Sequence, residues 1–399
     1  MKICFLSYSN TGGAGKATVR IIKSLKKLDI KCDHKFVIKD GKLPFKDKIK
    51  EKINRHSSKL EKNKKNSFKS LSLFPSSLWK DLNKSDYDII HLTWINEILS
   101  IEDIGKIKKP IVWTLADMWP FTGLSHYDDY SKKAFWRKKN YLRNKKPFFD
   151  IDYWLLNRKI KSWKNMDIIC PSNWILECAK NSMVMSDFRH HLIPWPVDMT
   201  FYKKLNKTKL RRFFNLPIKK KLIIFNAFNG IKDSRKGWKY LIKAVEITKE
   251  EYDIVLIGED KNLYIKNNTK KNFFSVGKFK DELGVSKILN CGDLIVIPSM
   301  MDNLPQVGIE AQACGLPVVT FDCNGLKDLV SHKKNGYLAK AYDYKSLAKG
   351  IDWTIRNLKK ENLSRNAIKM AKSNWDSKIV STQYKALYDK ILKKYEGVA

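Results

Sequence analysis

The chain has 399 residues, of which 43% are hydrophobic and 30% charged, a composition typical of an ordinary globular protein and not of a disordered or fibrous one. Its 78 lysines and arginines against 41 acidic residues give a net charge of +37, which predicts an anionic partner such as a nucleotide, a nucleic acid or an anionic lipid. The seven cysteines are scattered and never form a Cys-x-x-Cys pair, which argues against a disulfide framework or zinc ribbon and favours a reducing cytoplasm. Because the apolar runs are strand-sized and Met1 leads into no signal region, we expect a protein that is neither secreted nor membrane-spanning.

Short β-rich runs alternate with helical stretches along the chain. In the first half the predicted strands are 3–7, 32–37, 88–92, 110–115 and 168–172. A second series covers 222–226, 254–258, 273–276, 294–298 and 317–321, with helices predicted at 237–248, 304–314 and 347–358. This alternation predicts an α/β protein with two consecutive Rossmann-like, doubly wound parallel sheets.

A basic stretch separates the two series. Residues 199–221 carry nine basic side chains and no acidic one, and we place the linker there. The predicted domains therefore cover 1–198 and 199–375. The tail 376–399 has a helical pattern and is expected to pack back across the junction.

Two segments of the first half concentrate positive charge. Residues 42–84 hold 13 basic and 4 acidic side chains. A Lys-rich face exposed to solvent and a functional binding surface are equally good interpretations of this segment. Residues 131–164 hold 12 basic and 2 acidic side chains interleaved with eight aromatic ones. Cations mixed with large rings are typical of elements at an anionic membrane surface, although single-stranded nucleic acid uses the same chemistry. We favour the membrane interpretation, with Lys138, Lys139 and Arg143 among the contacting cations.

A glycine turn follows the first predicted strand and opens a helix. Gly12 and Gly13 would expose backbone N–H groups to an anion there. The turn is not a Walker loop, because Asn10 and Ala17 stand where that motif requires Gly and Ser or Thr. A plain strand-to-helix turn explains the glycines equally well.

A second candidate anion site follows the first strand of the second series. The segment 233–237 places Arg235 and Lys236 just ahead of a predicted helix. Two cations beside a helix N-terminus, at the carboxyl end of a parallel strand, could hold a diphosphate.

The strongest signal is the segment 298–319. A predicted strand ends there, a loop carries Asp302, and a helix that starts near Leu304 carries Glu310 on its second turn. Each carboxylate can accept hydrogen bonds from the vicinal hydroxyls of a ribose or hexose. The structural alternative is a helix N-cap at Asp302 and a surface salt bridge at Glu310.

Together these segments resemble the retaining, nucleotide-sugar-dependent glycosyltransferases of the GT-B fold, family 4, over nearly the whole chain. The family pattern of an acid, seven residues and Glu, followed by Ala-x-Ala-x-Gly-x-Pro-Val-Val, is met from Asp302 to Val319. The resemblance implies that Asp302, with its neighbours Asn303 and Leu304, contacts the donor sugar and that Glu310 contacts the ribose. It also implies that the donor diphosphate is held by four residues from the two domains: Arg235, Lys236, Gly12 and Gly13.

A narrower likeness, to family members that build bacterial surface polysaccharides, lies in 88–96 and 113–123. Before Asp117 the family has a His close to the donor sugar and the reacting centre, whereas this chain has Ala116. The chain also lacks the family's cysteine-rich insert after the second stretch. His91 and Trp94 are candidate acceptor contacts; for His91, as for His126, a packed or hydrogen-bonded histidine is the more common interpretation.

We therefore expect a retaining hexosyltransferase whose first domain binds the acceptor and whose second binds a nucleotide diphosphosugar. The leaving diphosphate would take the acceptor proton while Arg235 and Lys236 neutralise its charge, so no protein base, metal or other cofactor is required. The expected acceptor is a lipid-linked saccharide, which makes the chain a cytoplasmic protein peripheral to the inner membrane face. The alternatives are a nucleotide-sugar epimerase or hydrolase of the same fold, and a basic nucleic-acid-binding protein, which would leave Asp302 and Glu310 unexplained. No nucleic acid is expected.

Overall fold

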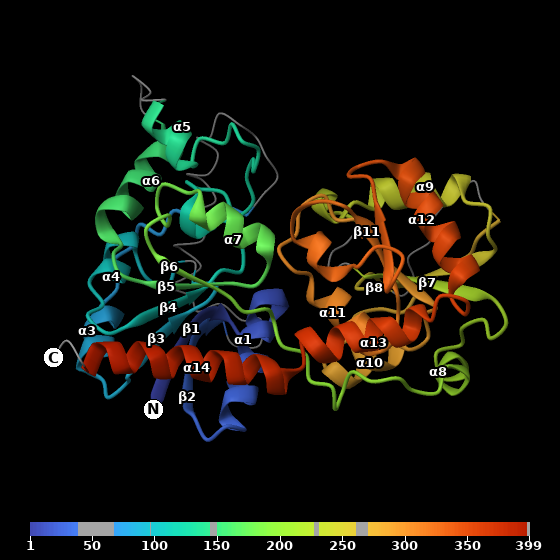
Figure 1. Ribbon diagram of the computed structural model, residues 1–399, viewed down its shortest axis with the longest axis horizontal. Coiled ribbons are helices and arrows are strands. Elements are labelled where there is room, and N and C mark those ends of the chain that lie inside the picture. The colour runs from blue at the N-terminus through green and yellow to red at the C-terminus, as the bar shows by residue number, and fades with distance from the viewer. Residues whose placement is uncertain (39–67, 96, 144–149, 227–230, 261–269, 397–399) are drawn as a thin grey trace. The chain divides into compact units, whose positions relative to one another are not determined.

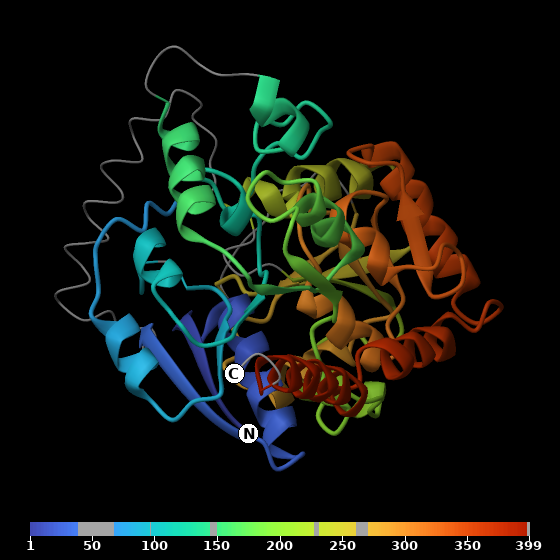
Figure 2. The same ribbon diagram turned by 60° about the vertical axis from the view of Figure 1, so that its left-hand side comes forward.

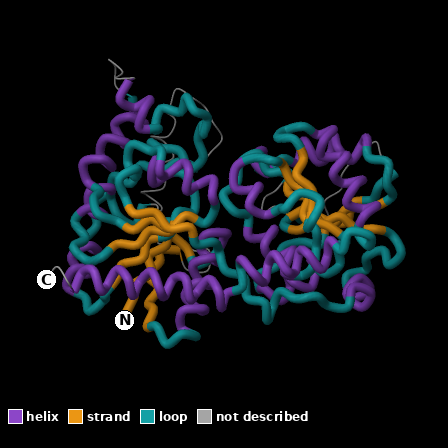
Figure 3. Tube along the Cα trace, in the orientation of Figure 1, coloured by secondary structure: helices purple, strands orange, loops and turns teal. Residues whose placement is uncertain are grey.

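The computed structural model describes residues 1–38, 68–95, 97–143, 150–226, 231–260 and 270–396. The chain divides into two compact units, which we call unit 1 (Met1–Trp195 with Val380–Ala399) and unit 2 (Pro196–Ile379). Figure 3 shows strands at the centre of each unit with helices around them. The prediction of two parallel-sheet α/β domains is confirmed within the described residues.

The sheet of unit 1 is parallel throughout and has the strand order β2-β1-β3-β4-β5-β6. Its strands are β1 (Lys2–Ser9), β2 (Lys31–Ile38), β3 (Ile89–Leu92), β4 (Ile111–Thr114), β5 (Asp167–Cys170) and β6 (Arg189–Leu192). Its helices are α1 (Gly12–Lys26), α3 (Leu78–Lys84), α4 (Ile101–Gly105), α5 (Lys138–Arg143), α6 (Ile151–Ser162), α7 (Asn173–Lys180) and most of α14 (Ser377–Glu396). The strand order reverses between β1 and β3, the place where open α/β sheets form a ligand-binding crevice.

The sheet of unit 2 is also parallel and has the order β12-β11-β10-β7-β8-β9. Its strands are β7 (Lys221–Asn226), β8 (Tyr252–Ile257), β9 (Phe273–Ser275), β10 (Leu294–Ile297), β11 (Val318–Phe321) and β12 (Gly336–Ala339). Its helices are α8 (Lys207–Phe213), α9 (Trp238–Ile247), α10 (Glu282–Leu289), α11 (Gln306–Ala313), α12 (Tyr344–Asn357) and α13 (Leu363–Asn374). Here the order reverses between β7 and β10.

The central strands are apolar because both faces of each sheet are covered. Strands β3, β4 and β5 in unit 1 and β8, β10 and β11 in unit 2 are buried at every residue. Continuous apolar runs of this kind are what buried parallel sheets require, and they allowed the strands to be predicted. All seven cysteines are unpaired and buried among these elements.

The last long helix completes the core of unit 1. The Tyr388 hydroxyl of α14 lies 2.6 Å from Nδ1 of His91 on β3, and the Tyr384 hydroxyl lies 3.4 Å from Oγ1 of Thr114 on β4. Both tyrosines are fully buried. Figures 1 and 2 show this helix, in dark red, alongside the strands of unit 1. No helix among the described residues is both long and apolar enough to cross a bilayer.

The division between the units differs from the predicted boundaries at 198/199 and 375/376. It falls after Trp195 and after Ile379. The segment predicted as a linker, 199–221, is folded within unit 2 and contains α8. Its buried Arg211 donates to the Cys291 carbonyl at 2.8 Å and to Asp293 Oδ2 at 2.7 Å, which ties this basic stretch to the body of the unit.

Candidate functional site

The cation-bearing loop of unit 2 lies at the carboxyl end of β7, on one side of the strand reversal. Asp233 caps a short 3-10 turn (Ser234–Lys236) by accepting from the Arg235 N–H at 3.0 Å. Gly237 follows with φ +73°, and a Cβ there would lie 1.8 Å from the Pro298 carbonyl oxygen. Only glycine allows both this backbone conformation and this close approach. Gly237 therefore lets the cation loop, residues 231–237, pack against the end of β10.

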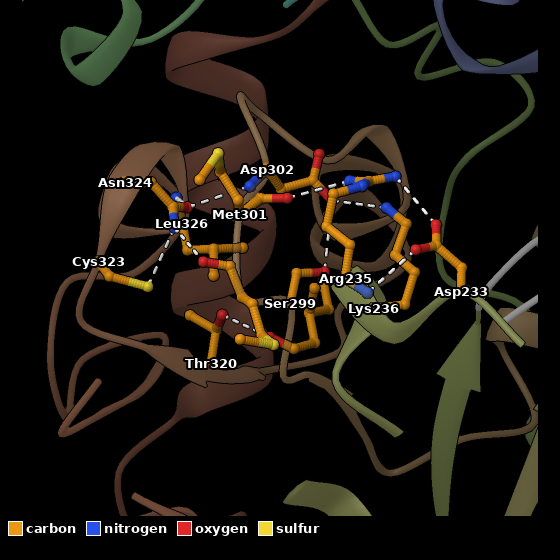
Figure 4. Close-up of polar contacts among 12 residues, drawn as sticks. Asp233, Arg235, Lys236, Ser299, Met301, Asp302, Thr320, Cys323, Asn324 and Leu326 are labelled. Atoms are coloured by element: carbon orange, nitrogen blue, oxygen red, sulfur yellow. Dashed lines mark hydrogen bonds and ion pairs between the residues drawn. The ribbon is translucent and has the colours of Figure 1, made fainter. Parts of the chain in front are cut away.

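The two predicted cations converge on the predicted acid from the neighbouring strand end. Lys236 Nζ lies 2.6 Å from Asp302 Oδ2, and Arg235 Nη1 lies 3.7 Å from the same oxygen. Figure 4 shows these side chains pointing toward one another from the two loops. Arg235 also donates to the Met301 carbonyl at 3.0 Å, and Met300 N–H donates to the Arg235 carbonyl at 2.7 Å. The structure therefore brings Arg235, Lys236 and Asp302 together.

The electrostatics of this cluster favour an ionised carboxylate. Asp302 is 8% exposed, and its burial opposes ionisation; the adjacent Lys236 and Arg235 outweigh that effect and hold the pKa of the carboxyl below its ordinary value. The side chains of Arg235 and Lys236 remain 26% and 22% exposed. Asp302 and Asp233 thus hold two partly accessible cations side by side, an arrangement that can bind an anion such as a phosphate.

The second acid is also placed at this edge of the sheet, and neither structural alternative holds. The N-cap of α11 is Pro305, so Asp302 is not a helix cap. Glu310 lies on the second turn of α11 and is 7% exposed, so it is not a surface salt bridge. Asn303 and Leu304 are only 2% and 3% exposed, so the described structure offers little of either residue to a ligand.

The structure adds two residues that sequence analysis missed at this site. Ser299 Oγ lies 3.3 Å from Asp302 Oδ2, and Asn324 Oδ1 accepts from the Asp302 N–H at 3.3 Å. The position of Ser299 directly after a buried strand could have indicated that this residue belongs to the site. Asn324 comes from the end of β11, 22 residues further along, and no local pattern indicates it.

The glycine turn of unit 1 lies at the strand reversal of that sheet. Thr11, Gly12 and Gly13 are exposed at the N-terminus of α1, whose first turn has no acidic residue. Gly12 has φ +72°, which a plain turn would require, but Gly13 has no such constraint. The N-terminus of a 15-residue helix can attract an anion, while a positive φ accounts for only one of the two glycines.

The prediction that His91 contacts an acceptor is wrong. Its ring is fully buried, stacks on Phe5 at 4.5 Å, and has both nitrogens within hydrogen-bond distance of Tyr388 and Thr114 hydroxyls. Burial lowers the pKa of His91 to about 3, so the imidazole is neutral. His91 is a core histidine.

Asp117 and Trp94 form a compact network with His126. Asp117 Oδ2 lies 2.6 Å from His126 Nδ1 and accepts from Trp94 Nε1 at 2.7 Å, while Oδ1 accepts from the Trp119 N–H at 3.1 Å. Both Asp117 and His126 are buried, whereas Trp94 is half-buried. These contacts orient the loop after β4, in which Ala116 is partly exposed.

The basic and aromatic segment 131–164 is more internal than its composition indicated. Trp136 and Trp163 are buried, and Tyr141 stacks on Tyr153 at 5.4 Å. Lys138 and Lys139 are exposed, and Lys138 pairs with Asp187 at 3.0 Å. Residues 144–149 and the Arg143 side chain, like most of the basic stretch 42–84, lie outside the described residues.

In the part of the chain that the structure describes, His, Cys, Asp and Glu side chains form no group of three that could hold a metal ion. The charged side chains described at the candidate site are Arg235, Lys236, Asp302 and Glu310, together with Asp233, whose Oδ2 lies 3.1 Å from Arg235 Nη2.

Comparison with known proteins agrees with this arrangement. Residues 206–372, which carry the cation loop and both acids, match the family "Glycosyl transferases group 1". The whole fold is similar to sucrose-phosphate synthase from Thermosynechococcus elongatus (TM-score 0.69, 16% identity, 99% of this chain and 100% of that one). It is also similar to Anabaena HepE in complex with UDP-glucose (TM-score 0.64, 17% identity, 98% and 100%). The chain has the GT-B fold, and its residues 206–372 form a glycosyl transferases group 1 domain.

Curated relatives match over shorter stretches. An example is the N,N'-diacetylbacillosaminyl-diphospho-undecaprenol alpha-1,3-N-acetylgalactosaminyltransferase of Campylobacter jejuni, which is 29% identical over 181 residues, 45% of this chain and 47% of that protein. The chain thus aligns with about half the length of this relative.

Proposed function

We propose that this GT-B protein is a retaining glycosyltransferase that moves a sugar from a nucleotide diphosphosugar to a saccharide acceptor in bacterial surface-glycan synthesis. The observation that carries the proposal is the cluster of Lys236, Arg235 and Asp302 at the strand reversal of a group 1 domain, with buried Glu310 on the adjoining helix. HepE, whose fold is similar, is in complex with UDP-glucose, which supports a nucleotide-sugar donor.

The geometry supports a division of labour among these side chains. Arg235 and Lys236 would bind the diphosphate and stabilise the charge that grows on it as the sugar–phosphate bond breaks. Asp302 would accept from hydroxyls of the transferred sugar, and Glu310 from those of the ribose. The acceptor oxygen would attack the same face of the sugar and pass its proton to the leaving diphosphate, so these four side chains need not supply a base or hold a metal.

We propose that the acceptor is lipid-linked and that unit 1 contacts the cytoplasmic face of the membrane through exposed cations such as Lys138 and Lys139. The relative from C. jejuni is named for a diphospho-undecaprenol acceptor, which supports this choice. The charge of +37 supports attraction to an anionic surface.

The test is calorimetric titration of the protein with a panel of nucleoside diphosphates that includes UDP. Lys236→Ala and Glu310→Ala should each weaken binding of the best ligand by about 1–3 kcal/mol, because each removes one partner of a buried polar contact. Lys232→Ala, an exposed lysine of the same loop, is the control for loss of a positive charge and should bind like the parent. Parent-like binding by both site variants would show that the donor site lies elsewhere.

A second assay separates transfer from epimerisation or hydrolysis. The parent is incubated with the nucleotide sugar alone, and release of monosaccharide or formation of an epimer is measured. We expect little of either without an acceptor. Rapid product formation without an acceptor would favour the alternative reactions.

A further inference from the structure

The loop that carries Asp302, residues 299–303, is held by side chains that come from outside it. The Met300 carbonyl oxygen accepts two hydrogen bonds, from Asn324 Nδ2 at 3.0 Å and from the Tyr342 hydroxyl at 2.9 Å. Asn324 lies after β11 and Tyr342 lies between β12 and α12. Two further strand ends are therefore connected to the cation and acid cluster through one backbone oxygen.

Both donors have an unusual backbone conformation. Asn324 has φ +39° and Tyr342 has φ +60°, in the left-handed region that non-glycine residues seldom occupy. Asparagine tolerates this region, but for a bulky residue such as tyrosine it is strained, and such strain persists only where the surroundings impose it. Two residues of this kind thus converge on a single carbonyl oxygen.

The contacts continue to the backbone of Asp302 itself. Its N–H donates to Asn324 Oδ1 at 3.3 Å, and its carbonyl accepts from the Gly325 N–H at 3.1 Å. One asparagine side chain therefore spans the loop, from the carbonyl of Met300 to the amide of Asp302. With its backbone held on both sides, the Asp302 carboxylate is directed at Lys236.

Core packing does not account for the conformation of Tyr342. Its ring lies 6.0 Å from Phe321 and 6.4 Å from Tyr240, yet the residue is 37% exposed. The positive φ of Tyr342 falls at the third position of the turn 340–343, which the Asp343 N–H closes on the Lys340 carbonyl at 3.1 Å, and from this turn its hydroxyl reaches the 299–303 loop.

We propose that Asn324 and Tyr342 are positioning residues, which hold the 299–303 loop and so fix the Asp302 carboxylate beside Lys236 and Arg235. This inference deepens the proposed function, on which its consequence for donor binding rests. Neither residue belongs to the cation and acid pattern from which the donor site was predicted.

The first test needs no ligand. Amide hydrogen exchange of peptides that cover 299–303 is compared among the parent, Tyr342→Phe, Asn324→Gly and Lys333→Gly. Lys333 is the control because it has φ +63° in the same unit, and its backbone N–H donates to the Gly336 carbonyl at 2.8 Å instead of to this loop. The loop should exchange roughly tenfold faster in the Tyr342 and Asn324 variants and at the parent rate in the control. Unchanged exchange in both variants would overturn the proposal, whether or not the protein binds a nucleotide sugar.

The second test separates positioning from a general loss of stability. UDP-glucose affinity is measured for Tyr342→Phe in the parent and in an Asp302→Asn background. If Tyr342 acts through the Asp302 carboxylate, its removal should weaken binding about fivefold in the parent and leave the Asp302→Asn chain nearly unchanged. Equal losses in both backgrounds would contradict positioning through Asp302. A parent that binds none of the nucleotide sugars tried would count against the proposed function, and the exchange comparison would still decide the role of Asn324 and Tyr342.

Discussion

The neutral imidazole of His91 contributes to the pH dependence of the stability of unit 1. The pKa of His91 is about 3 in the folded protein, below the ordinary 6.5, so the unfolded chain binds a proton between these values and the folded chain does not. The contribution of His91 to the free energy of unfolding is therefore fully present above pH 6.5 and is lost as the pH falls toward 3. Between pH 7 and pH 5 the loss from this one residue is about 2 kcal/mol.

We expect His91→Asn, which keeps a polar group near the Tyr388 hydroxyl but cannot titrate, to be less stable than the parent at pH 7. The gap should narrow by about 2 kcal/mol at pH 5, because only the parent carries the His91 protonation cost. Urea unfolding of both proteins at the two pH values measures this. Parallel pH dependence of parent and variant would show that another histidine is responsible.

Ala116 is the second residue with a consequence of its own. The family resemblance leads us to expect a histidine at this position, which lies on the loop that the Asp117 network orients. Ala116→His should raise kcat by roughly tenfold or more with little change in donor affinity, as expected for a group that acts in the transition state. Steady-state kinetics with the acceptor, alongside calorimetry with the donor, tests this. An unchanged kcat would show that the position is dispensable in this protein.

At the scale of elements, the cation loop depends on the tight approach of Gly237 to the end of β10. Gly237→Ala should destabilise unit 2 by more than about 1 kcal/mol, because the added Cβ meets both a positive φ and the Pro298 carbonyl. It should also weaken nucleoside diphosphate binding by displacing Arg235 and Lys236. Urea unfolding and calorimetry measure the two effects. Gly13→Ala, in open space at the start of α1, is the control for stability and should unfold like the parent.

Complete burial made the central strands the easiest elements to predict from sequence, although the partly exposed edge strands β2 and β9 were predicted as well. The apolar runs of β3, β8 and β10 indicate their strands directly, since both faces of a covered parallel sheet must be hydrophobic. The edge strands β6 and β12 were not predicted: β6 reads Arg-His-His-Leu and none of its residues is buried. Its pairing with β5 is set by the tertiary structure and not by a local pattern.

The same distinction holds for the candidate site. Arg235, Lys236 and Asp302 lie in loops that follow parallel strands, and Glu310 lies on the helix after one of these loops, so their positions along the chain indicated that they belong to the same edge of the sheet. Asn324 and Tyr342 reach the site through backbone conformations that only the folded loops impose. For His91 the more common interpretation, a packed and hydrogen-bonded histidine, is the one that the structure shows, because both ring nitrogens lie beside the buried hydroxyls of Tyr388 and Thr114.

At the scale of the whole molecule, the surplus of positive charge predicts docking on anionic membranes. Vesicle co-sedimentation should require anionic lipid and should weaken as salt rises, since each basic residue near the surface adds about 1 kcal/mol. Replacement of five of the 12 cations of 131–164 by Gln should reduce binding sharply; the five are Lys138, Lys139, Arg143, Lys145 and Lys146.

The matched control removes the same charge from exposed lysines of unit 2 and should bind vesicles nearly as well as the parent. These are Lys345, Lys349, Lys359, Lys360 and Lys369. Equal losses in the two variants would mean that net charge alone is responsible. Competition with single-stranded DNA at matched phosphate gives the further comparison, and preferential binding of DNA at physiological salt would contradict the membrane role.

Helix α14 has a consequence for the order in which the protein matures on the ribosome. Unit 1 needs Tyr384 and Tyr388 to cover His91 and Thr114, but about 180 residues of unit 2 are translated before those tyrosines exist. At a translation rate of roughly 5–20 residues per second, the nascent first unit therefore lacks these two tyrosines for about 10–40 s. Unit 2 emerges uninterrupted and can close first, so the N-terminal half of the polypeptide is the last to finish folding.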